Sequence, residues 1–267
     1  MKSTNIKYLI PFFILSIVSC TKDIHVNLND AAPQIVITGE VNNAAGPYLV
    51  RITKTVNFSV SNTFPPVSGA TVKITDSTSG QTDLLTETSS GVYTTQLLPQ
   101  GTPGHTYQLF ISVGGQTYTA ISTMPQIVSL DSVTFEHKTD LGGTTINAIP
   151  NFQDPPGVAN YYSFTEYINN KLFNKAIFVF EDRLSDGRYV TSPLSMDSAY
   201  LKTGDNLQLE MRCVDKNTYN YFNEFASILD ASNFQSAAPA NPVTNISNNA
   251  LGYFSANTIQ SKSVIVK

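Results

Sequence analysis

The sequence predicts a mostly β protein, with an N-terminal immunoglobulin-like β-sandwich followed by a second β-rich domain that contains one short helix. Charged residues make up only 13% of the chain, against about 25% in an average soluble domain. Many positions carry Thr, Ser or Asn instead, which suit solvent-facing strand positions and turns better than helices. Apolar and polar residues also alternate over many short segments, as in half-buried strands.

Residues 1–19 have the order of parts of a secretory signal peptide: a basic start, a short apolar run, and the closing residues Ile17-Val18-Ser19-Cys20. The apolar run is shorter than the roughly 20 residues that a transmembrane helix needs. Its end resembles a bacterial lipobox, in which the cysteine is lipidated and becomes the first mature residue. Cys20 is therefore the predicted lipidation site, and a simple anchor or a chance cysteine is the alternative.

Residues 20–33 have no apolar period and are predicted to be a tether. Lys22-Asp23 loosely resembles the charged export signal of surface-exposed lipoproteins in Bacteroidota. We therefore expect the protein on the outer membrane at the cell surface, with an ordinary spacer facing the periplasm as the alternative.

The length after the leader predicts two domains, because a usual domain has about 100 to 150 residues. Without residues 1–19 the chain keeps 14 of its 16 basic residues against 20 acidic ones. This mildly acidic balance argues against nucleic acid as a partner.

Residues 34–125 carry the predicted sandwich. About seven short strands with turn signals every 8 to 12 residues are typical of this fold. One turn can be placed by residue: Gly114-Gly115 predicts a two-residue hairpin. Its register sets Val113 opposite Gln116 and Ile111 opposite Tyr118, so that both apolar faces match.

Residues 126–267 form the predicted second domain. Strands are expected near residues 128–135, 144–152, 161–168, 176–181, 207–214 and 264–266. A helix is expected near residues 216–229, because apolar residues recur there with a helical period. Its predicted apolar face consists of Tyr219, Phe222, Phe225, Ala226 and Leu229.

With Cys20 lipidated, Cys213 has no partner for an internal disulfide. It alternates with Leu207, Leu209 and Met211 along one strand face. We therefore expect a buried small hydrophobe rather than a nucleophile.

Several short motifs, in their order along the chain, resemble the domain of unknown function 4249 family, lipoproteins of Bacteroidota. They are the lipobox, Ile35-Val36-Ile37-Thr38-Gly39-Glu40, Tyr48-Leu49-Val50-Arg51-Ile52-Thr53, Ser68-Gly69-Ala70-Thr71-Val72-Lys73-Ile74, Gly91-Val92-Tyr93, Gly104-His105-Thr106-Tyr107, Asn160-Tyr161-Tyr162, Pro242-Val243-Thr244-Asn245-Ile246 and Leu251-Gly252-Tyr253-Phe254. The resemblance implies an outer-membrane lipoprotein whose gene often lies near those of TonB-dependent receptors. Some of the same motifs resemble the carboxypeptidase-regulatory-like sandwich, which implies a fold and no active site.

Known catalytic motifs are absent from the sequence, which has neither G-x-S-x-G nor H-E-x-x-H. His25, His105 and His137 are expected on the surface. We therefore predict no enzyme activity and assign no catalytic, cofactor-binding or metal-ligating residue. A calcium site around Asp182 and Asp186 is the alternative to a solvated turn there.

Aromatic residues crowd the second half of the chain, and most are expected in the core. Tyr161, Tyr162 and Tyr221 are the candidates for a partner surface. Ser77, Ser132 and Ser198 each follow an aspartate, in a pattern that resembles the O-glycosylation sequon of Bacteroidota.

The function predicted from these observations is that of a lipid-anchored accessory or binding protein, acting with a TonB-dependent receptor or another outer-membrane complex. A structural or adhesive surface lipoprotein is the first alternative. A hydrolase with an unrecognised site is the second, and a deep pocket lined by carboxylates would favour it.

Overall fold

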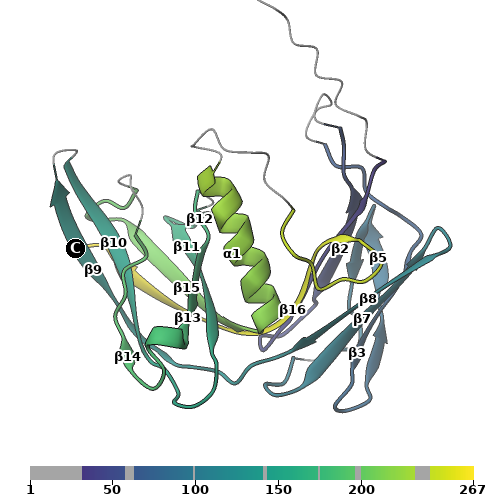
Figure 1. Ribbon diagram of the computed structural model, residues 1–267, viewed down its shortest axis with the longest axis horizontal. Coiled ribbons are helices and arrows are strands. Elements are labelled where there is room, and N and C mark those ends of the chain that lie inside the picture. Colours follow the sequence, from purple (N-terminus) through teal and green to yellow (C-terminus); the bar gives the residue numbers. More distant parts are fainter. Residues whose placement is uncertain are drawn as a thin grey trace, which may run out of the picture. The chain divides into compact units, whose positions relative to one another are not determined.

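The computed structural model describes residues 32–57, 63–98, 100–140, 143–173, 175–195, 200–231 and 241–267, which lie in one compact unit that begins at Ala32. These residues are mostly β with a single α-helix among them, so the predicted fold class is confirmed (Figure 1). None of their helices combines the length and the apolar character needed to cross a bilayer. The predicted signal peptide and Cys20 lie outside the described residues.

The largest layer is a nine-stranded sheet. Its strands are β1 (Ile35–Asn42), β2 (Leu49–Lys54), β5 (Thr86–Ser89), β6 (Val92–Thr94), β11 (Tyr161–Ile168), β12 (Lys171–Leu172), β13 (Phe178–Glu181), β15 (Asn206–Val214) and β16 (Leu251–Ile265). They follow the order β12-β11-β15-β16-β1-β2-β6-β5, and β13 also pairs with β11.

Two smaller sheets complete the β structure. One has the order β4-β3-β7-β8, and the other has the order β14-β10-β9. Their strands are β3 (Thr71–Asp76), β4 (Thr82–Leu84), β7 (Thr106–Val113), β8 (Gln116–Thr123), β9 (Leu130–Asp140), β10 (Gly143–Gln153) and β14 (Tyr189–Val190). A short 3-10 helix spans Asp182–Leu184, and the α-helix α1 spans Lys216–Ala231.

Each smaller sheet shares a hydrophobic core with part of the large one. The first core joins strands β1, β2, β6 and β16 to the four-stranded sheet, through residues such as Ile37, Leu109 and Phe254. The second joins β11 and β15 to the three-stranded sheet, through residues such as Phe152 and Leu209. Both cores are therefore sandwiched between sheets, as expected for the predicted class.

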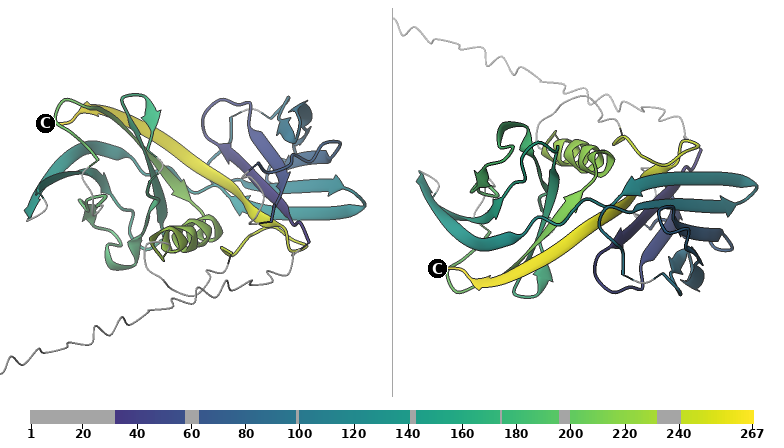
Figure 2. Two further views of the ribbon diagram at one scale, coloured as in Figure 1. Left: turned by 90° about the horizontal axis from the view of Figure 1, so that it is seen from above. Right: turned by 90° about the horizontal axis from the view of Figure 1, so that it is seen from below.

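Strand β16 belongs to both cores (Figure 2). It pairs parallel to β1, with Gly252 beside Ile37, and antiparallel to β15, with Val264 beside Leu207. The sequence predicted a strand only at residues 264–266, because the polar residues of β16 hide its period. The domain ranges 34–125 and 126–267 stay a prediction, and the structure adds that β16 of the second range pairs with β1 of the first.

Two local predictions are confirmed. Strands β7 and β8 pair with Val113 opposite Gln116 and with Ile111 opposite Tyr118. The side chain of Cys213 is buried in the second core and forms no disulfide.

Helix α1 begins where predicted, and Asp215 caps it. The Asp215 Oδ1 atom accepts a hydrogen bond from the Thr218 amide at 2.8 Å, which satisfies one of the unpaired N–H groups of the first turn. The predicted apolar face is correct only in part: Phe222 is partly buried, whereas Phe225 is 38% exposed. The reason is that α1 covers the sheet mainly through its first turns, where Tyr219, Tyr221 and Phe222 meet aromatic residues of β11 and β16.

Candidate functional site

The nine-stranded sheet has a polar face opposite the two cores. Because side chains alternate along a strand, residues between the core positions of β1, β11, β15 and β16 share this face. The register places Glu40 beside Ser255 and Ser163 beside Arg212. Helix α1 lies along this face (Figure 1).

An ion cluster occupies the polar face. Arg212 lies 3.4 Å from Glu40 Oε1 through its Nε atom and 2.5 Å from Glu210 Oε1 through a terminal nitrogen. Its other terminal nitrogen donates a hydrogen bond to Thr165 Oγ1 at 2.9 Å. Burial raises the pKa of Glu210, against the lowering effect of Arg212. One guanidinium thus serves two carboxylates that belong to different strands.

A cavity of about 300 Å³ adjoins this cluster. Five of its lining residues carry its chemistry: Glu40, Arg212, Phe222, Tyr253 and Asn257. Its volume is at the lower end of the range for small-molecule sites, roughly 300–1,000 Å³. Strands β1, β11, β15 and β16 and helix α1 each contribute to its wall.

Glu166 is a carboxyl group with only 1% of its surface exposed. Its Oε1 atom accepts a hydrogen bond from the Tyr200 hydroxyl at 3.2 Å, whereas Oε2 has no hydrogen-bond partner among the described residues. Burial raises the pKa of Glu166 to about 7, which the hydrogen bond from Tyr200 opposes only in part. Near neutral pH this group can therefore exchange a proton.

Sequence reasoning missed both the cavity residues and Glu166. The signal for Glu166 was present, because it follows Tyr162 and Phe164 at a spacing of two and so falls on the core face of β11. Glu40, Arg212 and Asn257 gave no such signal, since a polar residue at a polar strand position is ordinary. Only the pairing of distant strands brings them together.

The three tyrosines predicted to form a partner surface differ in their exposure. Tyr162 is fully buried and its hydroxyl donates a hydrogen bond to Asp154, so its side chain cannot contact a partner. The ring of Tyr161 packs at a tilt against that of Tyr219, with 5.1 Å between ring centroids. Tyr221 is 5.0 Å from Tyr253 by the same measure. Tyr161 and Tyr221 are partly buried, and a partner surface there stays a prediction.

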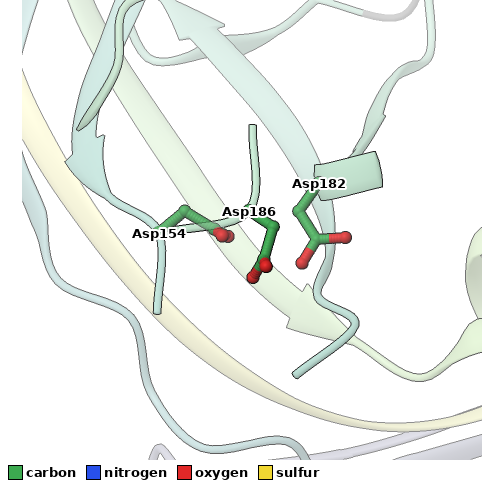
Figure 3. Close-up of side chains that lie close together, drawn as sticks. All are labelled: Asp154, Asp182 and Asp186. Carbon is green, nitrogen blue, oxygen red and sulfur yellow. The ribbon is translucent and has the colours of Figure 1, made fainter. Parts of the chain in front are cut away.

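Three carboxylates meet where two predicted loops approach each other. Oxygen atoms of Asp154, Asp182 and Asp186 lie within 4.8 Å of one another (Figure 3). Such oxygens are the ligands that Ca²⁺ prefers. The interpretation as a solvated turn is wrong for Asp182, because it is buried. No pattern in the sequence pointed to the fully buried Asp154 as a third member.

The same three side chains also hold the loops together. Asp154 Oδ2 accepts a hydrogen bond from the Gly187 amide at 3.1 Å, and Asp186 Oδ1 accepts one from the Gly157 amide at 2.7 Å. Burial raises the pKa of Asp154, and the nearby charges of Asp182 and Asp186 add to that effect. The cluster offers ligands to a cation, while its hydrogen bonds give it a structural role in any case.

The remaining candidates lie apart from the cavity. Ser77 and Ser132 are exposed, and Ser198 lies outside the described residues. His137 is exposed as predicted. His105 is only partly exposed, because its Nδ1 atom lies 2.7 Å from the buried Asp76.

Comparison with known proteins assigns the chain to a family. None of the curated proteins compared matches it. The family described as Domain of unknown function (DUF4249) matches residues 21–263. The chain belongs to this family. The DUF4249 match covers the first core, all but the last residues of the second core, and all the cavity residues named above. Its description states no activity.

Proposed function

We propose that this DUF4249 protein is a noncatalytic binding protein, held at the outer membrane by a lipid on Cys20. The observation that supports the binding role is the polar cavity. A cavity walled by several strands and helix α1, with a charged cluster and buried polar atoms, lowers the stability of the fold unless a ligand compensates for the unpaired groups.

The proposed place of action is the cell surface, as an accessory subunit of a TonB-dependent receptor or another outer-membrane complex. Support comes from the lipobox ending at Cys20, the charged residues Lys22-Asp23 behind it, and the family resemblance. The tether over residues 20–33 would leave the folded part free to reach a membrane-embedded partner.

Affinity purification from detergent-solubilised membranes tests this proposal. The full chain would carry a C-terminal tag, and the co-purifying proteins would be identified by mass spectrometry. We expect an outer-membrane receptor or a component of such a complex, recovered in amounts comparable to the bait and depleted when the bait is Cys20→Ala. Recovery of no outer-membrane protein from wild-type membranes would contradict the proposal.

One observation favours a hydrolase as a second candidate. Glu166, with a pKa of about 7, is a buried carboxyl group that can exchange a proton near neutral pH, as catalytic acids and bases do. An assay of the purified protein with chromogenic esters and glycosides decides between the two candidates. Turnover that Glu166→Gln abolishes would favour the hydrolase, whereas binding without turnover favours the proposal above.

A further inference from the structure

The cavity beside the ion cluster contains polar atoms that the fold leaves unpaired. Asn257 Oδ1 and Thr218 Oγ1 have no hydrogen-bond partner among the described residues, and each side chain lines the cavity and is 1% exposed. Asn257 donates to Ser255 Oγ at 3.2 Å, so its amide nitrogen is used and its oxygen is not. A buried polar atom without a partner destabilises the fold.

These unpaired atoms favour a ligand that donates hydrogen bonds. An amide oxygen only accepts, and a hydroxyl oxygen can accept as well as donate. A ligand with several N–H groups would pair with both residues, whereas a ligand that only accepts would leave Asn257 Oδ1 unpaired.

The charges of the cluster favour a cation. Arg212 is the one cationic residue of the cluster, and it contacts two carboxylates, Glu40 and Glu210. The formal charge of this group of three is therefore negative. Glu40 also lines the cavity, so an anionic ligand would meet repulsion there and a cationic ligand would meet attraction.

The aromatic walls favour the same kind of ligand. Tyr253 and Phe222 line the cavity with their ring centroids 4.8 Å apart, and Tyr167 and Phe173 also contribute to the lining. Aromatic rings attract a positively charged group while also covering the apolar part of an organic molecule.

We propose that this cavity binds a small organic cation, an amine or a guanidinium, whose N–H groups donate to the free acceptors and whose charge is stabilised by Glu40. The inference rests on the proposed binding function and names the class of its ligand. The volume of about 300 Å³ suits a compact molecule or the charged end of a longer one.

A matched series of four-carbon probes tests the charge preference. Butylamine, butylguanidinium, n-butanol and butyrate would be titrated into the detergent-solubilised full chain, with calorimetry and ligand-observed NMR as the readouts. We expect the two cations to bind at least about tenfold more tightly than n-butanol, a difference of about 1.4 kcal/mol. Butyrate should not bind measurably.

Two variants and a control place the binding in the cavity. Glu40→Gln should weaken butylamine binding at least about fivefold and leave n-butanol binding unchanged, because it removes the charge and keeps the shape. Asn257→Asp should strengthen butylamine binding. Glu136→Gln makes the same chemical change as Glu40→Gln at an exposed position outside the cavity lining and should change nothing.

Three results would overturn the inference. The first is equal binding of all four probes. The second is unchanged butylamine affinity in a Glu40→Gln variant that has native circular dichroism. Either result would show that the cavity does not select a cation. The third is that no probe binds, which would reject the proposal that the ligand is a cation. Recovery of an outer-membrane partner tests the proposed function independently of these results.

Discussion

Glu166 is a carboxyl group that the fold holds almost completely away from water. Its pKa of about 7 lies above the ordinary value near 4.3 for a glutamate, because burial disfavours the charged form. Below the ordinary value it is protonated in both the folded and the unfolded chain. As the pH rises, the carboxyl ionises first in the unfolded chain. The free energy of unfolding therefore falls with increasing pH until the pH passes the pKa that the carboxyl has in the folded chain.

The free energy of unfolding should therefore fall between pH 5 and pH 8. The part due to Glu166 is about 2 kcal/mol, since each pKa unit corresponds to about 1.4 kcal/mol. Urea unfolding at the two pH values measures it in the wild-type chain and in Glu166→Gln. The variant should lose this part of the pH dependence, and the exposed control Glu136→Gln should keep it. Equal pH dependence in wild type and Glu166→Gln would show that the carboxyl is not buried as described.

At the scale of elements, the parallel pairing of β1 with β16 depends on Gly252. This residue has a backbone φ of +96°, and a Cβ atom there would overlap the carbonyl oxygen of Ile37 on β1. Only glycine combines that backbone conformation with that close approach.

Gly252→Ala should lower the free energy of unfolding by at least about 3 kcal/mol, since both strain and a steric clash oppose the alanine. Gly69→Ala is the matched control, because Gly69 has a φ of +74° with open space around it, and should cost about 1–2 kcal/mol. Denaturant unfolding of both variants measures the difference. Similar losses in the two variants would contradict the close pairing of β1 and β16.

Helix α1 is joined to the sheets by Asp215. Besides capping the helix, Asp215 accepts a hydrogen bond from Ser122 Oγ at 2.5 Å, and Ser122 Oγ accepts one from the Ala256 amide at 2.7 Å. The cap therefore connects α1, β8 and β16.

Asp215→Ala should destabilise the protein by about 1–2 kcal/mol through loss of the cap alone, with a further loss from Ser122. Asp215→Asn keeps a capping oxygen and should cost less. Thermal unfolding of both variants gives the comparison, and an alanine variant as stable as the asparagine variant would argue against the cap.

The pairing of two strands could be predicted from the sequence where the two strands are close together in the chain. The register of β7 with β8 follows from Gly114-Gly115 and from the apolar alternation on either side of it. The pairing of β1 with β16 could not be predicted, because its partners are separated by more than 200 residues and no turn fixes their register. The helix could be predicted because its apolar period of 3.6 residues can be recognised within a single segment, without knowledge of a pairing strand.

At the scale of the whole molecule, the cavity exists only because β16 brings β1 and β15 into one sheet. Glu40, Arg212 and Asn257 come from three strands, and none is unusual in its own segment. The fold class could thus be predicted from composition and alternation, whereas the candidate site could not. The predicted lipid anchor differs from the cavity, since the pattern that predicts it lies within residues 1–20 alone.

The proposed function joins this cavity to the membrane through Cys20. The most direct test separates the membrane fraction from the soluble fraction after a carbonate wash, for the wild-type chain and for Cys20→Ala. We expect the wild type in the membrane fraction and the variant in the soluble fraction. The circular dichroism of the two should be the same, because Cys20 precedes the compact unit that begins at Ala32. A variant that stays with the membrane after the wash would contradict anchoring through Cys20.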